Sequence, residues 1–313
     1  MTAPLALLDS ASLYFRSFYA LPDSMTAPDG TVVNAVRGFA DTIARILTDR
    51  QPGRLVACLD ADWRPDFRVR ALPSYKAHRV AEDGDGLEEE VPDLLTPQIP
   101  IILDLLDAAG LCTAEAAGYE ADDVIGALVA REKTDPVEVI SGDRDMFQVV
   151  RHEPTPATVW YVGSGWNKVQ VIGPAELAAK YDLPAEDTGP RYADMAVLRG
   201  DPSDGLPGVP GIGEKTAAKL IREFGDLQAL IAGATAGDKR IPKRAATNIL
   251  ASAEYLAAAP TVVAVAVDAP VVLDRDDRVP TEPADLDRFL AIKKQWGLGA
   301  SADRLLEAIT TGR

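Results

Sequence analysis

Three apolar, strand-like runs of this 313-residue chain are each followed by aspartate. LALL precedes Asp9, LVACL precedes Asp60, and VEVI leads into ISGDRD, which carries Asp143 and Asp145. A carboxylate at the end of a buried strand is costly unless a cation or a basic partner compensates it. Because ligand sites in open parallel sheets form at the carboxyl ends of strands, we expect the three ends to converge. Oxygen-rich clusters suit Mg²⁺ or Mn²⁺, so the pattern predicts a divalent-metal enzyme with phosphate-ester chemistry.

Two further acidic motifs support the same prediction. GYEADD contains Glu120, Asp122 and Asp123, and RGDPSDG contains Asp201 and Asp204. Any one of these residues has an ordinary alternative role as a helix cap or turn residue, positions that aspartate favours. Recurrence in separate segments favours a shared site over several unrelated caps.

A glycine-rich turn followed by an amphipathic helix is the second strong signal, in LPGVPGIGEKTAAKLIREFG (206–225). Glycines at 208, 211 and 213 let the backbone approach a phosphate, and the helix that follows aims N–H groups at it. Lys215, Lys219 and Arg222 add positive charge along the helix. The pattern is typical of a helix–hairpin–helix, which grips the DNA backbone without reading bases. A plain tight turn is the alternative.

Basic and aromatic side chains alternate after Asp60 in WRPDFRVRALPSYKAHR (63–79). Basic groups that meet phosphates, beside aromatic rings that stack on unpaired bases, indicate recognition of single strands or frayed ends. A solvated basic helix paired with the acidic segment at 82–90 explains the pattern equally well. The basic members are Arg64, Arg68, Arg70, Lys76 and Arg79.

Two more basic features could either contact nucleic-acid phosphates or have an ordinary structural role. Arg16, in SLYFRSFYA, is expected to steer a phosphate or to form an ordinary ion pair. KRIPKR (239–244) is expected to contact duplex backbone or to be a surface turn.

Composition narrows the class of protein. The hydrophobic content of 47% is that of a soluble globular protein, and the net charge of −16 is a weak argument against nucleic acid because a metal site supplies much of the acid. Cys58 and Cys112 are too few for a disulfide framework, which favours a reducing cytoplasm. Two histidines nearly exclude a histidine-rich zinc site. We expect no signal peptide and no membrane span.

Periodicity predicts an α/β fold. Strands are expected at 5–8, 55–59 and 137–140, with a hairpin between 158 and 172. Helices are expected at 35–47, 99–109, 119–130 and 176–181, and this alternation predicts a largely parallel sheet flanked by helices. After about residue 192 short helices separated by glycine and proline take over. We therefore expect one domain over 1–185 and a second over 186–313, whose last part from 250 braces the core.

The motifs taken together closely resemble the 5′-nuclease, or flap endonuclease, family, in the bacterial form related to the 5′–3′ exonuclease domain of DNA polymerase I. The resemblance spans nearly the whole chain and rests on LLDSASLYFRSFYA, LDADWRPDFR…YKAHR, GYEADDVIGAL, ISGDRDMFQVV, LRGDPSDGLPGVPGIGEKTA and IKKQWGL. It implies a PIN-like nuclease core with a helical arch near 64–98 and a helix-3-turn-helix DNA-binding region. It also implies a stand-alone nuclease, without a polymerase region.

The resemblance assigns roles residue by residue. Lys76 and Arg79 match basic residues over the scissile phosphate, and Tyr75 matches a stacking residue beside them. The turn at 208–213 resembles one whose carbonyls hold K⁺. Further DNA contacts are expected at Arg16, Arg68, Gly208, Gly211, Gly213, Lys215, Thr216 and Lys219. The implied metal-binding acids are Asp9, Asp60, Glu120, Asp122, Asp123, Asp143, Asp145, Asp201 and Asp204.

Two departures from the family pattern stand out. Gly205 replaces an asparagine that often follows the SD pair, and the acidic run at 82–90 lies where the arch is expected. The first is expected to alter hydrogen bonding near Asp204, and the second to weaken or redirect threading of a single strand.

The implied activity is hydrolysis of DNA phosphodiester bonds at 5′ flaps and 5′ ends, by a monomer acting in replication and repair. In the expected two-metal scheme, one ion activates a water and the other stabilises the departing 3′-oxygen. Two alternatives stay open: an RNA-cutting PIN-type nuclease, which the acids alone would serve, and a non-catalytic protein that binds branched DNA.

Overall fold

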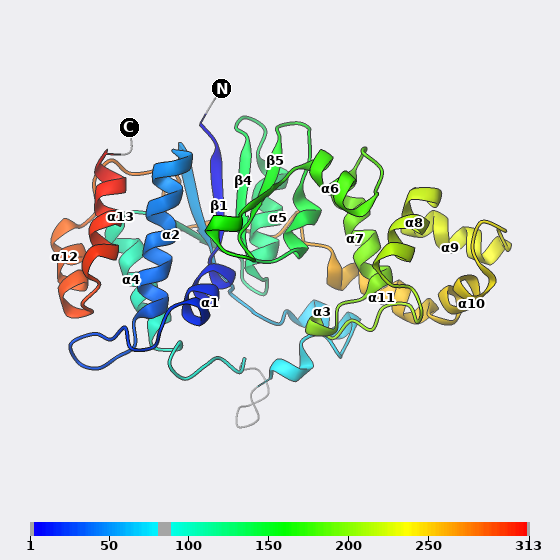
Figure 1. Ribbon diagram of the computed structural model, residues 1–313, viewed down its shortest axis with the longest axis horizontal. Coiled ribbons are helices and arrows are strands. Elements are labelled where there is room, and N and C mark those ends of the chain that lie inside the picture. Colours follow the sequence, from blue (N-terminus) through cyan, green and yellow to red (C-terminus); the bar gives the residue numbers. More distant parts are fainter. Residues whose placement is uncertain (1–2, 81–88, 312–313) are drawn as a thin grey trace.

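The computed structural model describes residues 3–80 and 89–311. A sheet of strand order β6-β5-β4-β1-β2-β3-β7 lies at its centre (Figure 1). Strands β1 to β5 run parallel where they pair, and β6 and β7 add antiparallel edges. The strands are β1 (Leu5–Asp9), β2 (Arg54–Cys58), β3 (Cys112–Glu115), β4 (Val137–Ser141), β5 (Ala157–Tyr161), β6 (Gln170–Ile172) and β7 (Val272–Leu273).

The central strands are apolar on both faces because helices cover both sides. In β1, Leu5 and Leu7 belong to one apolar cluster, and Ala6 and Leu8 belong to another on the opposite face. Side chains alternate between faces along a strand, so a run such as LALL must bury its whole length. This explains why the sequence shows continuous apolar runs instead of an alternating pattern.

One face of the sheet is covered by helices from both ends of the chain. The apolar cluster on this face joins α1 (Ser10–Ala20), α2 (Asn34–Arg50) and α4 (Gln98–Ala109). Helices α12 (Leu286–Gln295) and α13 (Gly299–Thr311) pack on α4 and α2 (Figure 1). Helices α12 and α13 therefore brace this face of the core, whereas α11 (Ala253–Val263), also in the segment from 250, packs on α7 (Thr188–Arg199) and α3 (Asp66–Ala71).

The opposite face leads into the helical extension. One continuous apolar cluster joins α5 (Ala121–Arg131), the short helix η2 (Asp145–Val149) and the extension. In Figure 1 the extension reaches away from the sheet, with α8, α9 and α10 at its far end. It comprises α6 (Pro174–Tyr181), α7 (Thr188–Arg199), α8 (Glu214–Phe224), α9 (Leu227–Ala236), α10 (Lys243–Ala251) and α11 (Ala253–Val263).

Most elements agree with the sequence prediction. The three predicted central strands, the hairpin and the helix ending at Gly110 are confirmed, and Gly110 closes α4 with a left-handed φ of 78°. Strand β3 and helix α1 were missed. The division at residue 185 stays a prediction.

The expected arch near 64–98 lies only partly within the described residues. It contributes the short helices α3 (Asp66–Ala71) and η1 (Ala77–Arg79), and residues 81–88 of the acidic run lie outside the description. Across the described ranges, every helix is too short or too polar to traverse a bilayer.

Candidate active site

The three acidic strand ends lie side by side, as the sequence predicted. Strands β4, β1 and β2 are parallel neighbours; Asp9 ends β1, and Asp60 and Asp143 follow β2 and β4 by two residues. Asp9 also caps α1, since its Oδ1 accepts from the Ser12 amide at 3.2 Å, and its Oδ2 accepts from Ser141 Oγ at 2.6 Å. The capping role and the shared-site role therefore coexist at Asp9.

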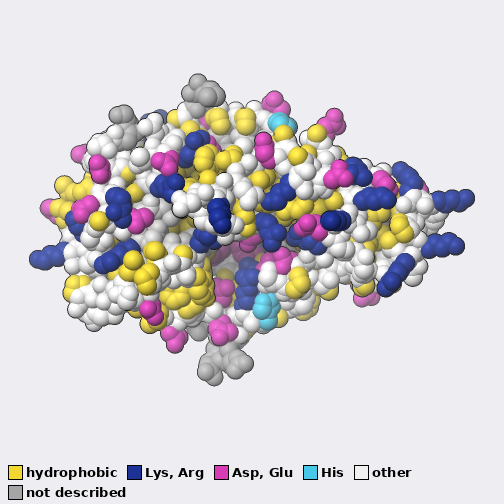
Figure 2. All heavy atoms as spheres, viewed as in Figure 1, with side chains coloured by type: hydrophobic (Ala, Val, Ile, Leu, Met, Phe, Trp, Pro, Cys, Tyr) yellow, Lys and Arg dark blue, Asp and Glu magenta, His cyan; other side chains and the backbone are white. Residues whose placement is uncertain are grey.

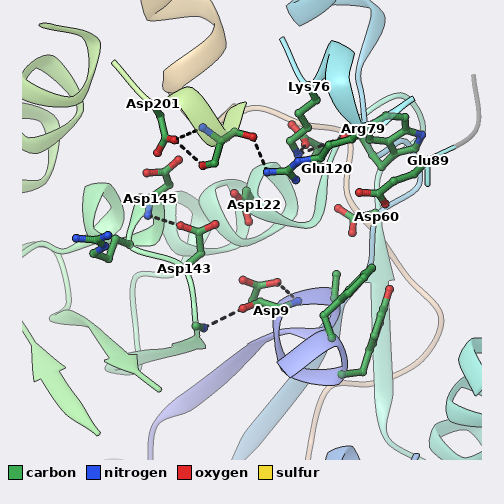
Figure 3. Close-up of a pocket in the computed structure, with 18 of the residues that line it drawn as sticks. Asp9, Asp60, Lys76, Arg79, Glu89, Glu120, Asp122, Asp143, Asp145 and Asp201 are labelled. Carbon is green, nitrogen blue, oxygen red and sulfur yellow. Dashed lines mark hydrogen bonds and ion pairs between the residues drawn. The ribbon is translucent and has the colours of Figure 1, made fainter. Parts of the chain in front are cut away.

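Acids from three other elements line the same cavity. Asp122 comes from the first turn of α5, Asp145 from η2, and Asp201 from the turn after α7. The cavity has a volume of about 570 Å³, and Figure 3 shows Asp9, Asp122 and Asp143 pointing into a common space. Segments spread over nearly 200 residues of sequence thus deliver carboxylates to one pocket.

Burial and mutual repulsion disfavour the ionised forms of these acids. Burial raises the pKa of Asp9 to about 7, and Asp143 and Asp60 add to the rise. The pKa of Asp145 is raised to about 8 by burial and then by Asp143 and Asp204, and that of Asp122 is raised for the same kind of reason. A set of carboxylates in this condition gains most from a bound cation.

The donor set fits a hydrated divalent cation better than a tightly enclosed ion. Among residues 3–80 and 89–311, no three acidic, histidine or cysteine side chains are gathered closely enough to hold an ion by themselves. Mg²⁺ keeps several of its waters and binds proteins through one or two carboxylates plus substrate phosphate. An open ring of oxygen donors around a wide pocket matches that requirement.

Glu120 lies in the pocket wall but is occupied by protein donors. It accepts hydrogen bonds from the Tyr75 hydroxyl at 2.9 and 2.8 Å and forms an ion pair with Lys76. Burial alone would lower the pKa of Lys76. The nearby acids Glu120, Asp204 and Asp122 raise it by more than burial lowers it, so the pKa is raised overall and the amine remains a cation. Glu120 therefore holds the basic side chain at the rim of the pocket (Figure 3).

Asp123 points away from the cavity, which corrects the prediction that it faces the site with the other acids. Its side chain is fully buried and binds Arg68 through both oxygens, at 2.7 Å each. Arg68 is 2% exposed and also donates to the Val262 carbonyl at 3.0 Å, so its expected place among the DNA contacts is wrong. Tyr75 is 4% exposed, and its ring has no free face to stack on a base.

Arg79 and Asp204 form the second cation–acid pair at the rim. Their side chains lie 2.8 Å apart, and Arg79 also donates to the Ser203 carbonyl at 2.8 Å. Asp204 is absent from the cavity lining, which includes its neighbour in sequence, Ser203. Lys76 and Arg79, the two residues predicted to meet a phosphate, are thus each paired with an acidic side chain of the protein.

Several lining residues were missed at the sequence level. Glu89 lines the cavity, as do Arg144 and Arg199 on the side of Asp145 and Asp201. Arg144 stands between two predicted site acids in GDRD, a signal that could have found it. Glu89 belongs to the acidic run at 82–90, which was expected to affect threading and not to line the site.

The glycine-rich turn joins α7 to α8. Gly213 precedes α8, and Gly211 and Gly213 are exposed with open space where a side chain would be, apart from Asn248 near Gly211. Gly208 differs: it is buried, and a Cβ there would lie 2.4 Å from the Arg199 carbonyl oxygen, so its glycine is explained by internal packing. Direct DNA contact at Gly208 is therefore not supported.

The basic side chains of this region face outward. Lys215 and Lys219 are exposed on α8, and Thr216 beside them is half-buried. Arg16 instead donates to the Gly163 carbonyl and lines a different hollow from the acidic cavity. Figure 2 shows acidic side chains inside a central hollow, with lysines and arginines around its rim and across the helical extension.

Family models match both halves of the chain. The model described as 5′-3′ exonuclease, N-terminal resolvase-like domain, matches residues 4–182, and that described as 5′-3′ exonuclease, C-terminal SAM fold, matches residues 188–286. The chain belongs to the 5′–3′ exonuclease family.

Relatives of nearly the same length occur in two bacteria. The chain is 52% identical to a 5′-3′ exonuclease of Mycobacterium tuberculosis over 99% of both proteins, and 50% identical to one of Streptomyces coelicolor over 97% of this chain and 99% of that relative. It is also 40% identical to M. tuberculosis DNA polymerase I over 72% of this chain and 24% of the polymerase.

Solved structures share the fold. A bacteriophage T5 flap endonuclease, in a complex with DNA and metal ions, superposes with a TM-score of 0.64 at 18% identity, covering 98% of this chain and 99% of the other. The catalytic core of Rad2 with DNA superposes with a TM-score of 0.59, also at 18% identity, over 98% and 93%. The predicted fold class is confirmed.

Proposed function

We propose that this protein is a divalent-metal-dependent 5′ nuclease that hydrolyses DNA phosphodiester bonds at 5′ flaps and 5′ ends. The observation that carries the proposal is one cavity lined by acids from three neighbouring strand ends and by Lys76 and Arg79. Its relatives are named 5′-3′ exonucleases, and a fold neighbour is a flap endonuclease solved with DNA and metal ions. Both facts support the same reaction.

The acids and the rim cations have separate tasks in this proposal. Ions at the pocket acids would supply Lewis-acid stabilisation of the phosphoryl oxygens and a lower pKa for the attacking water. The acids proposed to hold them are the aspartates that line the cavity: Asp9, Asp60, Asp122, Asp143, Asp145 and Asp201. Glu120 and Asp204 position Lys76 and Arg79, which would neutralise charge that develops on the scissile phosphate.

The helical extension would hold the duplex beside the site. The N-terminus of α8 and the exposed Lys215 and Lys219 offer N–H groups and charge to phosphates, with no base contact required. Cleavage would then follow from DNA structure instead of sequence. Carbonyls of the turn at 208–213 are proposed to hold K⁺ against a phosphate, and replacing K⁺ by Na⁺ should weaken duplex binding without changing the divalent-ion requirement.

Cleavage of a labelled 5′-flap duplex tests the main proposal. With Mg²⁺ or Mn²⁺, products should appear at the junction and, on a recessed 5′ end, as short oligonucleotides. Matched RNA and RNA–DNA hybrid flaps should be poor substrates, because the proposed grip is on duplex DNA. Faster cutting of the RNA would establish an RNA-directed nuclease in its place.

Binding of flap DNA without cleavage would contradict the proposal that the protein is an enzyme. A protein that binds flaps tightly yet leaves them intact with either ion would be a branched-DNA binder. Calorimetry with Mn²⁺, without and with flap DNA, separates the two cases, since a pocket that holds no ion in either condition cannot act by this route. Sedimentation of the same preparation tests the expectation of a monomer.

A further inference from the structure

The segment that carries Lys76 lies so close to the turn after α7 that the turn has no room for a side chain at Gly205. A Cβ added at Gly205 would lie 2.0 Å from the Ser74 carbonyl oxygen and 2.9 Å from the Ser74 carbonyl carbon. Cβ atoms essentially never approach other heavy atoms within 3.0 Å, and here the obstacle is backbone. The contact therefore requires glycine for space, in addition to its φ of +74°.

Four contacts join the same two segments. Ser74 Oγ donates to the Gly205 carbonyl at 2.8 Å, and the Lys76 amide donates to the Asp204 carbonyl at 3.0 Å. Arg79 adds its bonds to the Ser203 carbonyl and the Asp204 carboxylate, each at 2.8 Å. The chain is thus fastened to the turn just before, at and just after Lys76.

Apart from Tyr75, which is buried and bonds Glu120 through its hydroxyl, the fastened segment has few contacts with the interior. Lys76 has a left-handed φ of 48°, and the η1 helix that follows it is a single turn of three residues. Ser74 is exposed, so its own side chain is not packed in the interior. A shift at Ser74 would therefore be transmitted to Lys76 two residues later, away from its place between Glu120 and the Trp63 carbonyl.

We propose that Gly205 is a positioning residue of the nuclease. The missing side chain lets the Ser74 carbonyl rest against the 201–205 turn, and this contact sets where Lys76 and Arg79 stand over the acidic pocket. The inference rests on the proposed function for its consequence in cleavage, but its structural half stands on the contact itself. A displacement of about 1 Å in a catalytic group costs about 100-fold in rate.

The competing explanation is that Gly205 serves only its positive φ. Two substitutions separate the explanations. Asn tolerates left-handed backbone far better than most residues, yet Gly205→Asn still introduces the Cβ that meets Ser74. Gly237→Ala is the matched control, because Gly237 has a φ of +70° and, apart from its immediate neighbours in sequence, no described residue comes within 4 Å of an added Cβ.

Amide hydrogen exchange tests the contact without reference to activity. In Gly205→Ala and Gly205→Asn, the amides of the 74–79 segment, that of Lys76 above all, should exchange faster than in the unaltered protein. Gly237→Ala should leave this segment unchanged. Unchanged exchange in Gly205→Asn would overturn the proposal, whatever the protein cleaves.

Single-turnover cleavage of the 5′ flap tests the consequence. Both Gly205 variants should cleave about 100-fold more slowly with flap affinity nearly unchanged. Gly237→Ala should cleave at the normal rate, even if its thermal stability is lower. In a background of Lys76→Ala and Arg79→Ala, Gly205→Asn should add little, because it acts through those two side chains.

The outcomes distinguish this inference from the proposed function. If the unaltered protein cuts flaps and Gly205→Asn cuts them equally fast, the positioning role is wrong and the nuclease stands. An equal slowing in the background without Lys76 and Arg79 would also overturn it, since Gly205 would then act through another route. If the unaltered protein cuts nothing while the exchange result holds, the proposed function fails and the contact remains.

Discussion

Arg68 and Asp123 form a two-point ion pair in the interior, with each guanidinium nitrogen 2.7 Å from its own carboxylate oxygen. Asp123 also accepts from the Ala266 amide at 2.7 Å, and Arg68 donates to the Val262 carbonyl at 3.0 Å. The pair therefore joins three parts of the fold: the basic segment, the start of α5 and the chain leaving α11. It connects the helical extension with the wall of the acidic cavity.

Asp123→Asn should destabilise the protein because the buried Arg68 cation loses one of its two carboxylate partners and keeps only Glu120. Loss of the sole partner of a buried ion costs about 3–5 kcal/mol in the free energy of unfolding, so the loss here, measured by urea denaturation, should be smaller than that. Asp66→Asn is the control, since Asp66 pairs with Arg70 on the surface and should change the unfolding midpoint little. The divalent-ion concentration for half-maximal cleavage should stay the same in the folded fraction of Asp123→Asn. A rise in it would make Asp123 a metal residue after all.

Lys76→Ala should reduce the single-turnover cleavage rate far more than flap affinity. Lys76 stands at the pocket rim, where a cation stabilises charge that appears mainly in the transition state, and removing one such group costs about 100- to 1,000-fold in rate. Loss of its partner should act through the same residue, so Glu120→Gln combined with Lys76→Ala should be much less than additive. Equal losses of rate and affinity in Lys76→Ala would identify a simple binding residue.

Lys219→Ala should show the reverse division. Lys219 is exposed on α8, away from the cavity, and its only ion pair is with Glu223 at 3.8 Å among the pairs of the described chain. Removing a phosphate-binding charge at this position should weaken DNA binding for all sequences alike and lower the slope of log affinity against log salt by about 1. Titration of a fluorescent flap at several salt concentrations measures this slope. An unchanged slope would place the duplex elsewhere on the extension.

The sequence predicted the parts of the site that depend on local pattern. Continuous apolar runs ending in Asp9, Asp60 and Asp143 identified buried parallel strands, and parallel strands bring such ends to one edge. Helix α1 was missed because it begins directly after Asp9, with no loop to mark the boundary. Strand β3 was missed because four residues of mixed polarity carry almost no periodic signal.

Local pattern could not predict which acids line the cavity and which pair with basic side chains of the protein. Asp122 and Asp123 are adjacent in GYEADD, yet the helical rotation between them turns one into the cavity and the other toward Arg68. Arg68 and Tyr75 lie in a basic, aromatic run that fits DNA binding, and only the tertiary position of α5 buries them. The close approach at Gly205 likewise depends on two segments 131 residues apart in sequence.

The pocket acids predict a specific dependence of stability on pH and divalent ion. Asp9 has a folded-state pKa of about 7 and Asp145 of about 8, against an ordinary value of 3.8, so the unfolded chain releases these protons first as pH rises. The stability that these two carboxyls contribute is fully present below their ordinary pKa and is lost as pH rises toward 8. Acids with a lowered pKa, such as Glu132 at about 2, change the stability only below about pH 5. In EDTA the melting temperature should therefore fall between about pH 5 and about pH 8, and Mg²⁺ should raise it more at the higher pH. Asp9→Asn with Asp145→Asn should flatten both responses, and a melting temperature that rises with pH in EDTA would show that these carboxyls are already compensated.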